Sequence, residues 1–190
     1  MIGQTRGIIF IFILWLCAAL LPCPFAYAQT VKISNLQVTS RQEDMLLFLN
    51  VEGAFDKKLD EAIHSGVPAV FSFSIELSGD QGLFRSRTIL ELSVTHTLKY
   101  NAMKNDYTVR RSWEDNRPLT TNTYEEAKEW MSGIENLRLL PLSHLQKGER
   151  YIIRSKVMLD KATLPFLNYI FFFISLWDFE SDWQYYRFIY

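Results

Sequence analysis

The sequence predicts a mainly β protein: an antiparallel β-sandwich, immunoglobulin-like in architecture, with two short helices and a preceding N-terminal signal peptide. Three observations lead to this prediction. Several stretches alternate apolar and polar residues with a period of two. These stretches recur roughly every ten to twenty residues, with only two brief helical patterns between them. The first 28 residues differ in composition from the rest of the 190-residue chain.

The clearest alternating stretch covers residues 69–77, where apolar side chains share one face and Ser72, Ser74 and Glu76 share the other. Such a pattern is typical of a strand with one buried face. The same pattern recurs at residues 45–51, 90–100, 107–113 and 151–159. A tight turn is predicted at residues 78–82.

Two segments have helical spacing instead. The first covers residues 55–63, with Asp56 as its cap and Gly66 as its stop signal. The second follows Thr123 and Glu126, which are spaced as a capping box. Its apolar stripe predicts a packing face made of Tyr124, Ala127, Met131 and Ile134. Residues 116–123 are predicted to be a loop.

The leader reads as a secretory signal peptide. Arg6 precedes an apolar run at residues 8–21, and Ala26 and Ala28 form an A-x-A cleavage site before Gln29. The run of about 14 residues is shorter than the ~20 that a membrane span needs. We therefore expect export to the periplasm, with residues 29–190 forming one β-rich domain. An uncleaved anchor, and with it association with the inner membrane, stays open.

Cysteine and charge exclude several classes of function. Cys17 and Cys23, the only cysteines, both lie in the leader, so the exported domain has no disulfide, thiolate nucleophile or cysteine metal site. The formal net charge is −1 and the charges are mixed, which excludes the basic stripe of a nucleic-acid-binding protein.

No residue is assigned a catalytic, cofactor-binding or metal-binding role. His64, His96 and His144 form no H-x-H or H-E-x-x-H pair, and no G-x-S-x-G, Walker or dinucleotide motif occurs. His96 lies on an otherwise apolar strand face, which favours a hydrogen-bonded core histidine over a general base. The sequence thus predicts a non-enzymatic protein that needs no cofactor.

One row of carboxylates keeps an enzyme open as the alternative. On a strand, Asp178, Glu180 and Asp182 would share one face at a spacing of ~7 Å. Paired glycosidase carboxylates lie ~5–10 Å apart, so an enzyme acting on envelope glycans is the rival hypothesis. A solvated acidic strand face explains the same spacing and is preferred.

The C-terminal third is unusually aromatic. Residues 164–177 carry no charge, which favours a strand buried on both faces over a membrane-surface or partner-binding segment or a true membrane span. Alternation then predicts a closing strand whose odd-numbered aromatics fill the core, with a β-bulge near Tyr185 and Tyr186. If these aromatics instead contact a partner or membrane, the face comprises Phe171, Phe173, Trp177, Phe179, Trp183 and Tyr185.

Four stretches also resemble a known family: "LDEAIHSGVPAVF", "LKYNAMKNDYTVRR", "LQKGERYIIRSKVMLD" and "LPFLNYIFFFISLWDFESDW". They span residues 59–183 and resemble a bacterial exported family known as domain of unknown function 4390. The resemblance implies no catalytic residues. It implies a link to membrane signalling, because some relatives are encoded beside a membrane sensor kinase.

Taken together, the residues predict a periplasmic binding or accessory module of the bacterial envelope. Its partner would be an envelope protein or the membrane surface, and not a nucleic acid, while the oligomeric state stays open. The alternatives are the glycan-acting enzyme and a purely structural sandwich domain.

Overall fold

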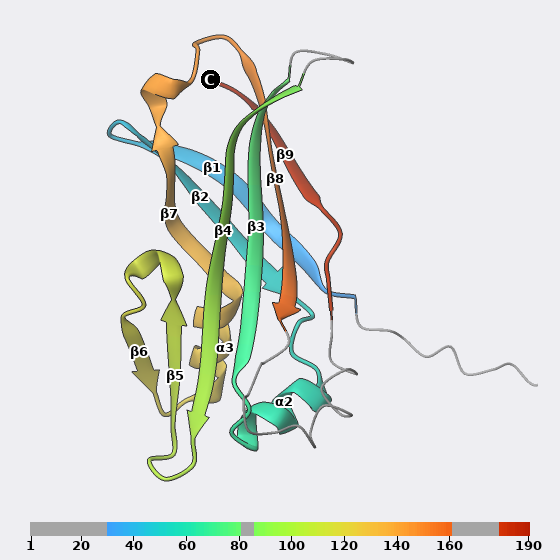
Figure 1. Ribbon diagram of the computed structural model, residues 1–190, viewed down its shortest axis with the longest axis vertical. Coiled ribbons are helices and arrows are strands. Elements are labelled where there is room, and N and C mark those ends of the chain that lie inside the picture. Colours follow the sequence, from blue (N-terminus) through green and yellow to red (C-terminus); the bar gives the residue numbers. More distant parts are fainter. Residues whose placement is uncertain (1–29, 81–85, 161–178) are drawn as a thin grey trace, which may run out of the picture.

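A computed structural model of the protein describes residues 30–80, 86–160 and 179–190 (Figure 1). The predicted signal peptide, residues 81–82 of the predicted turn, the uncharged stretch 164–177 and Asp178 lie outside the described residues. Residues 78–80 of the predicted turn belong instead to the strand Ala69–Asp80.

The described chain forms two antiparallel sheets (Figure 1). The smaller sheet has the order β1-β2-β7, with bounds Lys32–Arg41, Asp44–Glu52 and Gly133–Pro141. The larger has the order β6-β5-β4-β3-β8-β9, with bounds Pro118–Thr121, Asp106–Arg111, Ser86–Asn101, Ala69–Asp80, Arg150–Asp160 and Gln184–Ile189. Two short helices, α2 (Lys57–His64) and α3 (Tyr124–Ser132), complete the fold. The predicted mainly β architecture with two helices is confirmed.

The core lies between the two sheets and follows the predicted alternation. On β3 the side chains alternate strictly between buried and half-buried from Ala69 to Asp80, and Phe71, Phe73 and Ile75 are fully buried. The inward residues of β2 and β8 oppose or flank them, among them Leu47, Leu49, Ile153 and Val157. Burial of these large apolar side chains stabilises the sandwich, at about 1.5–3 kcal/mol per side chain.

The first helix begins as predicted. Asp56 is its N-cap, and its Oδ1 accepts a hydrogen bond from the Leu59 N–H at 2.8 Å. The capping box predicted for the second helix is wrong, because Glu126 accepts a hydrogen bond from the Thr121 hydroxyl instead. The predicted apolar stripe extends one residue too far, since α3 ends at Ser132 and Ile134 belongs to β7.

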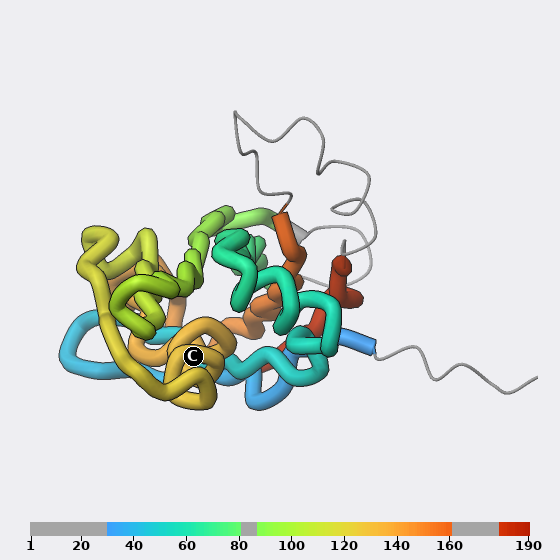
Figure 2. Tube along the Cα trace, turned by 90° about the horizontal axis from the view of Figure 1, so that it is seen from below, coloured from blue at the N-terminus to red at the C-terminus, as the bar shows by residue number. Residues whose placement is uncertain are grey.

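The two lateral sides of the sandwich differ. On one side β1 lies next to β9, so the edges of the two sheets meet. On the other side, β5 pairs with β4 only from His96 to Asn101, and β7 pairs only with β2 among the described strands. The first half of β4 and the outer edge of β7 therefore have no strand partner there. Figure 2, a view from below, shows the β4–β5–β6 end of the large sheet projecting beyond β3.

The segment before β9 contains a one-residue bulge. Glu180 lies opposite Met158, whereas Gln184 lies opposite Ser155, so four steps along one strand face three along the other. An extra residue of this kind reverses the face to which the following side chains point. A bulge was predicted at Tyr185 and Tyr186, but the structure places it between Ser181 and Trp183.

Candidate functional site

The bulge distributes the C-terminal aromatics between two faces. Before it, Phe179 points inward and meets Phe71 edge-to-face, with ring centroids 5.3 Å apart. After it, Tyr185 lies opposite Arg154, an outward-facing residue of β8, and is 48% exposed. Trp183 is half-buried against the same outward side chains. The prediction that Trp183 fills the core is therefore wrong.

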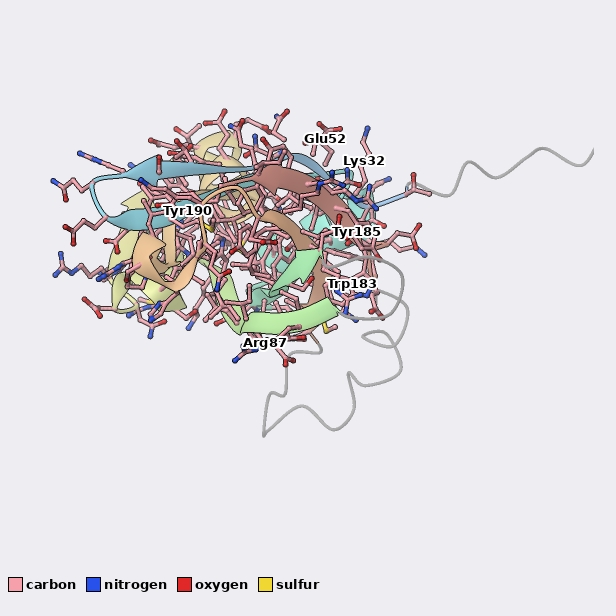
Figure 3. The ribbon with its side chains drawn as sticks, turned by 90° about the horizontal axis from the view of Figure 1, so that it is seen from above. Lys32, Glu52, Arg87, Trp183, Tyr185 and Tyr190 are labelled. Atoms are coloured by element: carbon pink, nitrogen blue, oxygen red, sulfur yellow. The ribbon has the colours of Figure 1, made fainter. Side chains whose placement is uncertain are left out.

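We call Arg154, Lys156, Trp183 and Tyr185 the outer aromatic face. The Arg154 guanidinium lies 4.5 Å from the centre of the Trp183 ring, and the Lys156 ammonium lies 5.1 Å from it. Both are cation–π contacts, which hold the indole against the sheet. Figure 3 shows Trp183 and Tyr185 together at one side of the molecule.

Each cation of this face also has a carboxylate partner. Glu76 Oε2 accepts hydrogen bonds from Arg154 at 2.6 and 3.0 Å, and this bonding raises the pKa of Arg154. Lys156 pairs with Glu180. The face is therefore aromatic, locally neutral and held in place by charge-assisted hydrogen bonds.

The structure describes two of the three residues in the carboxylate row on which the enzyme hypothesis rests. Asp178 lies outside the described residues, Glu180 is engaged by Lys156, and Asp182 is exposed at the bulge. None of the three cavities described for this structure is lined by Glu180 or Asp182.

His96 is fully buried and both ring nitrogens have partners. Nδ1 donates to the Met131 carbonyl at 2.9 Å, and Nε2 accepts from Trp113 Nε1 at 3.0 Å. Burial lowers the pKa of His96 to about 4, so the imidazole is neutral at physiological pH. This hydrogen-bonded state joins β4 to the end of α3 and matches a structural role.

His64 closes a second polar cluster that the sequence does not reveal. Its Nδ1 hydrogen-bonds the Asp60 carbonyl at 2.7 Å, and its Nε2 meets the Tyr107 hydroxyl at 2.8 Å. Tyr124 donates to Asp60 Oδ1 at 2.6 Å, and burial with this bond raises the pKa of Tyr124. The cluster ties α2 to β5 and α3.

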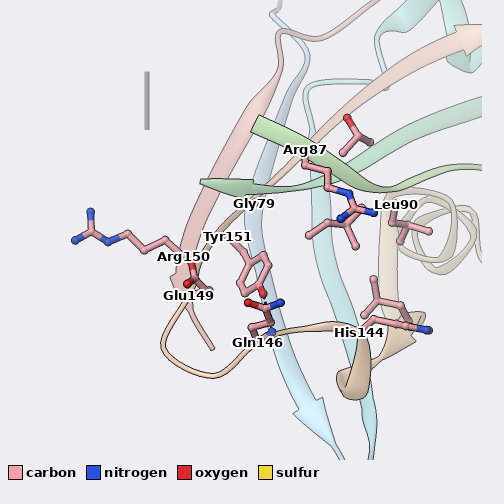
Figure 4. A pocket seen from close by; sticks show the side chains of 11 residues that line it. Gly79, Arg87, Leu90, His144, Gln146, Glu149, Arg150 and Tyr151 are labelled. Carbon is pink, nitrogen blue, oxygen red and sulfur yellow. Dashed lines mark hydrogen bonds between the residues drawn. The ribbon is translucent and has the colours of Figure 1, made fainter. Parts of the chain in front are cut away.

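Two cavities lie along the side where β4 and β7 lack strand partners. The upper one has a volume of about 480 Å³ and is bordered by residues 87–90 of β4, Leu140 of β7, Gly79 of β3 and Tyr151 of β8, together with residues of the segment 144–150 (Figure 4). The lower one has a volume of about 610 Å³ and is bordered by residues 92–94 of β4, residues 112–114 and residues 136–138 of β7. We call this β4–β7 side the seam.

A family model described as "Domain of unknown function (DUF4390)" matches residues 28–187. The chain belongs to this family. No curated protein and no solved structure gives a significant match. The family resemblance drawn from the four sequence stretches is thereby confirmed.

Within the described part of this DUF4390 chain, no helix has the length and apolar content needed to cross a membrane. The same residues hold no group of three or more His, Cys, Asp or Glu side chains placed to share a metal ion.

The structure brings together only part of the predicted partner face. Trp183 and Tyr185 lie side by side on the outside of the DUF4390 domain and Phe179 lies in its core, while Phe171, Phe173 and Trp177 fall outside the described residues. Sequence reasoning missed Arg154 and Lys156. Arg154 and Lys156 alternate with the buried residues Ile153 and Ser155, and this alternation predicts that both cations lie on the outer face of the strand.

Proposed function

We propose that this DUF4390 protein is a non-enzymatic binding or accessory module of the bacterial envelope. In this proposal it is exported to the periplasm and contacts an envelope protein through its outer aromatic face. The observation that carries the proposal is the position of Trp183 and Tyr185 on the outside of the large sheet, fixed by Arg154 and Lys156. Tryptophan, tyrosine and arginine are the residues that dominate protein–protein hot spots.

The charge balance of the face favours a protein over a lipid surface. Arg154 is paired with Glu76 and Lys156 with Glu180, so neither cation is free to attract anionic headgroups. Peripheral binding to anionic membranes depends on an excess of Lys and Arg beside the apolar side chains. The membrane surface is accordingly an outcome of the test and not the proposed partner.

Glu180 favours a binding role over the alternative of a glycan-acting enzyme. A glycosidase places its paired carboxylates on either side of the scissile bond of a sugar bound in a cleft or pocket. Glu180 instead lies beside the Lys156 ammonium and borders an open face.

A link to membrane signalling belongs to the same proposal, with the bound envelope protein as the point of contact.

In vivo photo-crosslinking tests this proposal. The photoreactive amino acid p-benzoylphenylalanine replaces Tyr185 in one strain and the 97% exposed Met103 in a matched control. We expect a discrete protein adduct from the periplasmic fraction at position 185, none at position 103, and loss of the adduct on Trp183→Ala. The processed chain should begin at Gln29. Absence of an adduct at position 185, an adduct with lipid alone, or retention of the chain in the cytoplasm would overturn the proposal.

A further inference from the structure

The first half of β4 presents a free hydrogen-bonding edge to the seam. The Thr95 N–H points away from β3, since it donates to the Ser112 hydroxyl at 2.9 Å. Backbone groups two residues apart in a strand point to the same side. The N–H groups of Ser93 and Glu91 therefore point into the seam, where no described strand pairs with them.

The lower cavity adjoins this edge, and the upper cavity extends from residues 87–90 of β4 across the large sheet to Gly79 of β3 and Tyr151 of β8. Seven of the eight β4 residues from 87 to 94 border one cavity or the other, with Glu91 as the exception, and Ile89 is an extra residue in the pairing with β3. Residues 87–94 span about 23 Å at ~3.3 Å per residue, the length of an added strand of about seven residues. On the opposite wall stand Leu137 and Leu140 of β7, with Trp113 at the lower end. A free edge beside pockets for alternate side chains is the arrangement by which proteins bind extended peptides.

Charge defines one end of the seam. Arg138 pairs with Asp44 at 2.9 Å and Glu114 pairs with Arg111 at 3.2 Å, so both borders of the lower cavity are neutralised. Arg87 makes no ion pair with the described residues. Figure 4 shows its side chain reaching over the upper cavity, while the side chain of Arg150 extends away from it. Arg87 thus offers a cation to an incoming carboxylate at the upper end, where the Glu149 carboxylate also borders the cavity.

We propose that the seam binds an extended segment of another polypeptide, which adds as a strand to residues 87–94 of β4 and places a carboxylate on Arg87. The added strand bridges the edges of β4 and β7 and puts alternate apolar side chains into the two cavities. The carboxylate comes from an Asp or Glu side chain or from a chain terminus. This site is separate from the outer aromatic face, so its failure leaves the proposed function untouched.

A random decapeptide library displayed on phage, selected against the full chain purified from the envelope fraction, supplies defined probes. We expect enriched peptides that alternate β-branched or aromatic residues and contain Asp or Glu. The best binder is then synthesised with a free C-terminus, as a C-terminal amide, with its acidic side chains replaced by amides, and with N-methyl groups at alternate residues. Fluorescence anisotropy gives each Kd. One of the two sets of alternate N-methyl groups removes the N–H donors that face β4. That set should weaken binding at least about tenfold, the effect of losing roughly one well-made hydrogen bond.

Two substitutions in the chain decide where the peptide binds. Ser93→Pro removes a seam-facing N–H without breaking the β3–β4 ladder, because proline is tolerated where the N–H faces outward. It should weaken binding about tenfold or more, whereas Ser93→Thr should not. The Arg87 side chain is exposed, and Arg87→Gln should weaken the binding of carboxylate-bearing peptides by a similar factor. If Ser93→Pro does not fold, Arg87→Gln alone tests the position of the peptide.

Three results would overturn the proposal. One is a selection that enriches no peptide. Another is a set of peptides that bind Arg87→Gln and Ser93→Pro as tightly as the parent. The third is a dimer in sedimentation velocity that Ser93→Pro dissociates, which would assign the seam to a second copy of this chain.

Discussion

At the residue scale, His96 illustrates how hydrogen bonding decides the role of a buried titratable group. The sequence places it on an apolar strand face, where it could be a base or a core residue. The two bonds, to Met131 and from Trp113, use both ring nitrogens and leave none for a substrate. Alternation predicted the burial of His96. It could not predict these partners, because they come from other segments, 35 and 17 residues away in sequence.

The lowered pKa of His96 makes a pH-dependent contribution to stability. Between the ordinary pKa of 6.5 and the folded value of about 4, the unfolded chain binds a proton that the folded chain does not. Stability from this group is therefore complete above about pH 6.5 and falls as the pH decreases toward 4, by about 3 kcal/mol in all. His96→Gln does not titrate and can still donate and accept. Urea unfolding from pH 7 to pH 4.5 should show a shallower decline for His96→Gln, and parallel declines would contradict the assignment.

At the element scale, strands that alternate regularly were predictable and irregular ones were not. β2, β3 and β8 bury every second residue over most of their length, which is the signal read from the sequence. β1 and β7 contain Asn35 and Asn136, whose positive φ angles of 53° and 61° break the alternation. The four-residue strand β6 begins at Pro118 and lies inside the predicted loop. Local backbone irregularities of this kind have no period to detect.

The segment leading into β9 was predictable in composition but not in orientation. Because Phe179 contacts Phe71 in the core, Phe179→Ala should cost about 3 kcal/mol. Trp183 lies on the outer face, so Trp183→Ala should cost only about 1 kcal/mol, mostly from lost cation–π contacts. Core placement of Trp183 would instead predict about 3–5 kcal/mol. Urea denaturation of both variants distinguishes the two, and a Trp183→Ala loss as large as that of Phe179→Ala would contradict the outer position.

At the scale of the whole molecule, the sandwich is closed on one side and open on the other. β9 pairs with β8 and also lies next to β1, so it joins the edges of the two sheets. Along the seam, by contrast, β4 and β7 are separated by cavities. We propose that a segment of another polypeptide binds on the open side, and we expect the fold to depend on β9 at the closed side.

Removal of β9 should therefore affect the entire domain. A chain ending at Trp183 loses β9, which covers the edge of β8. The lost strand includes Tyr186 and Phe188, which face the inward side of the sheet. We expect loss of a cooperative urea transition by circular dichroism. The control Tyr190→Ala keeps the backbone bonds with Gly148 and Glu149 and should cost less than about 1 kcal/mol. A truncated chain that still unfolds in a single sharp transition would show that the two sheets are held together without β9.

The bulge at Asp182 has a consequence for how natural selection acts on this end of the chain. Phe179 and Phe188 contribute to the core, so changes at these positions are selected through the amount of folded protein in the cell. Trp183 and Tyr185 lie on the outside, so under the proposed function changes there would be selected through loss of the partner contact. If the proposed contact exists, a single extra residue divides one run of aromatics between two evolutionary constraints, and two variants a few positions apart would fail for unrelated reasons.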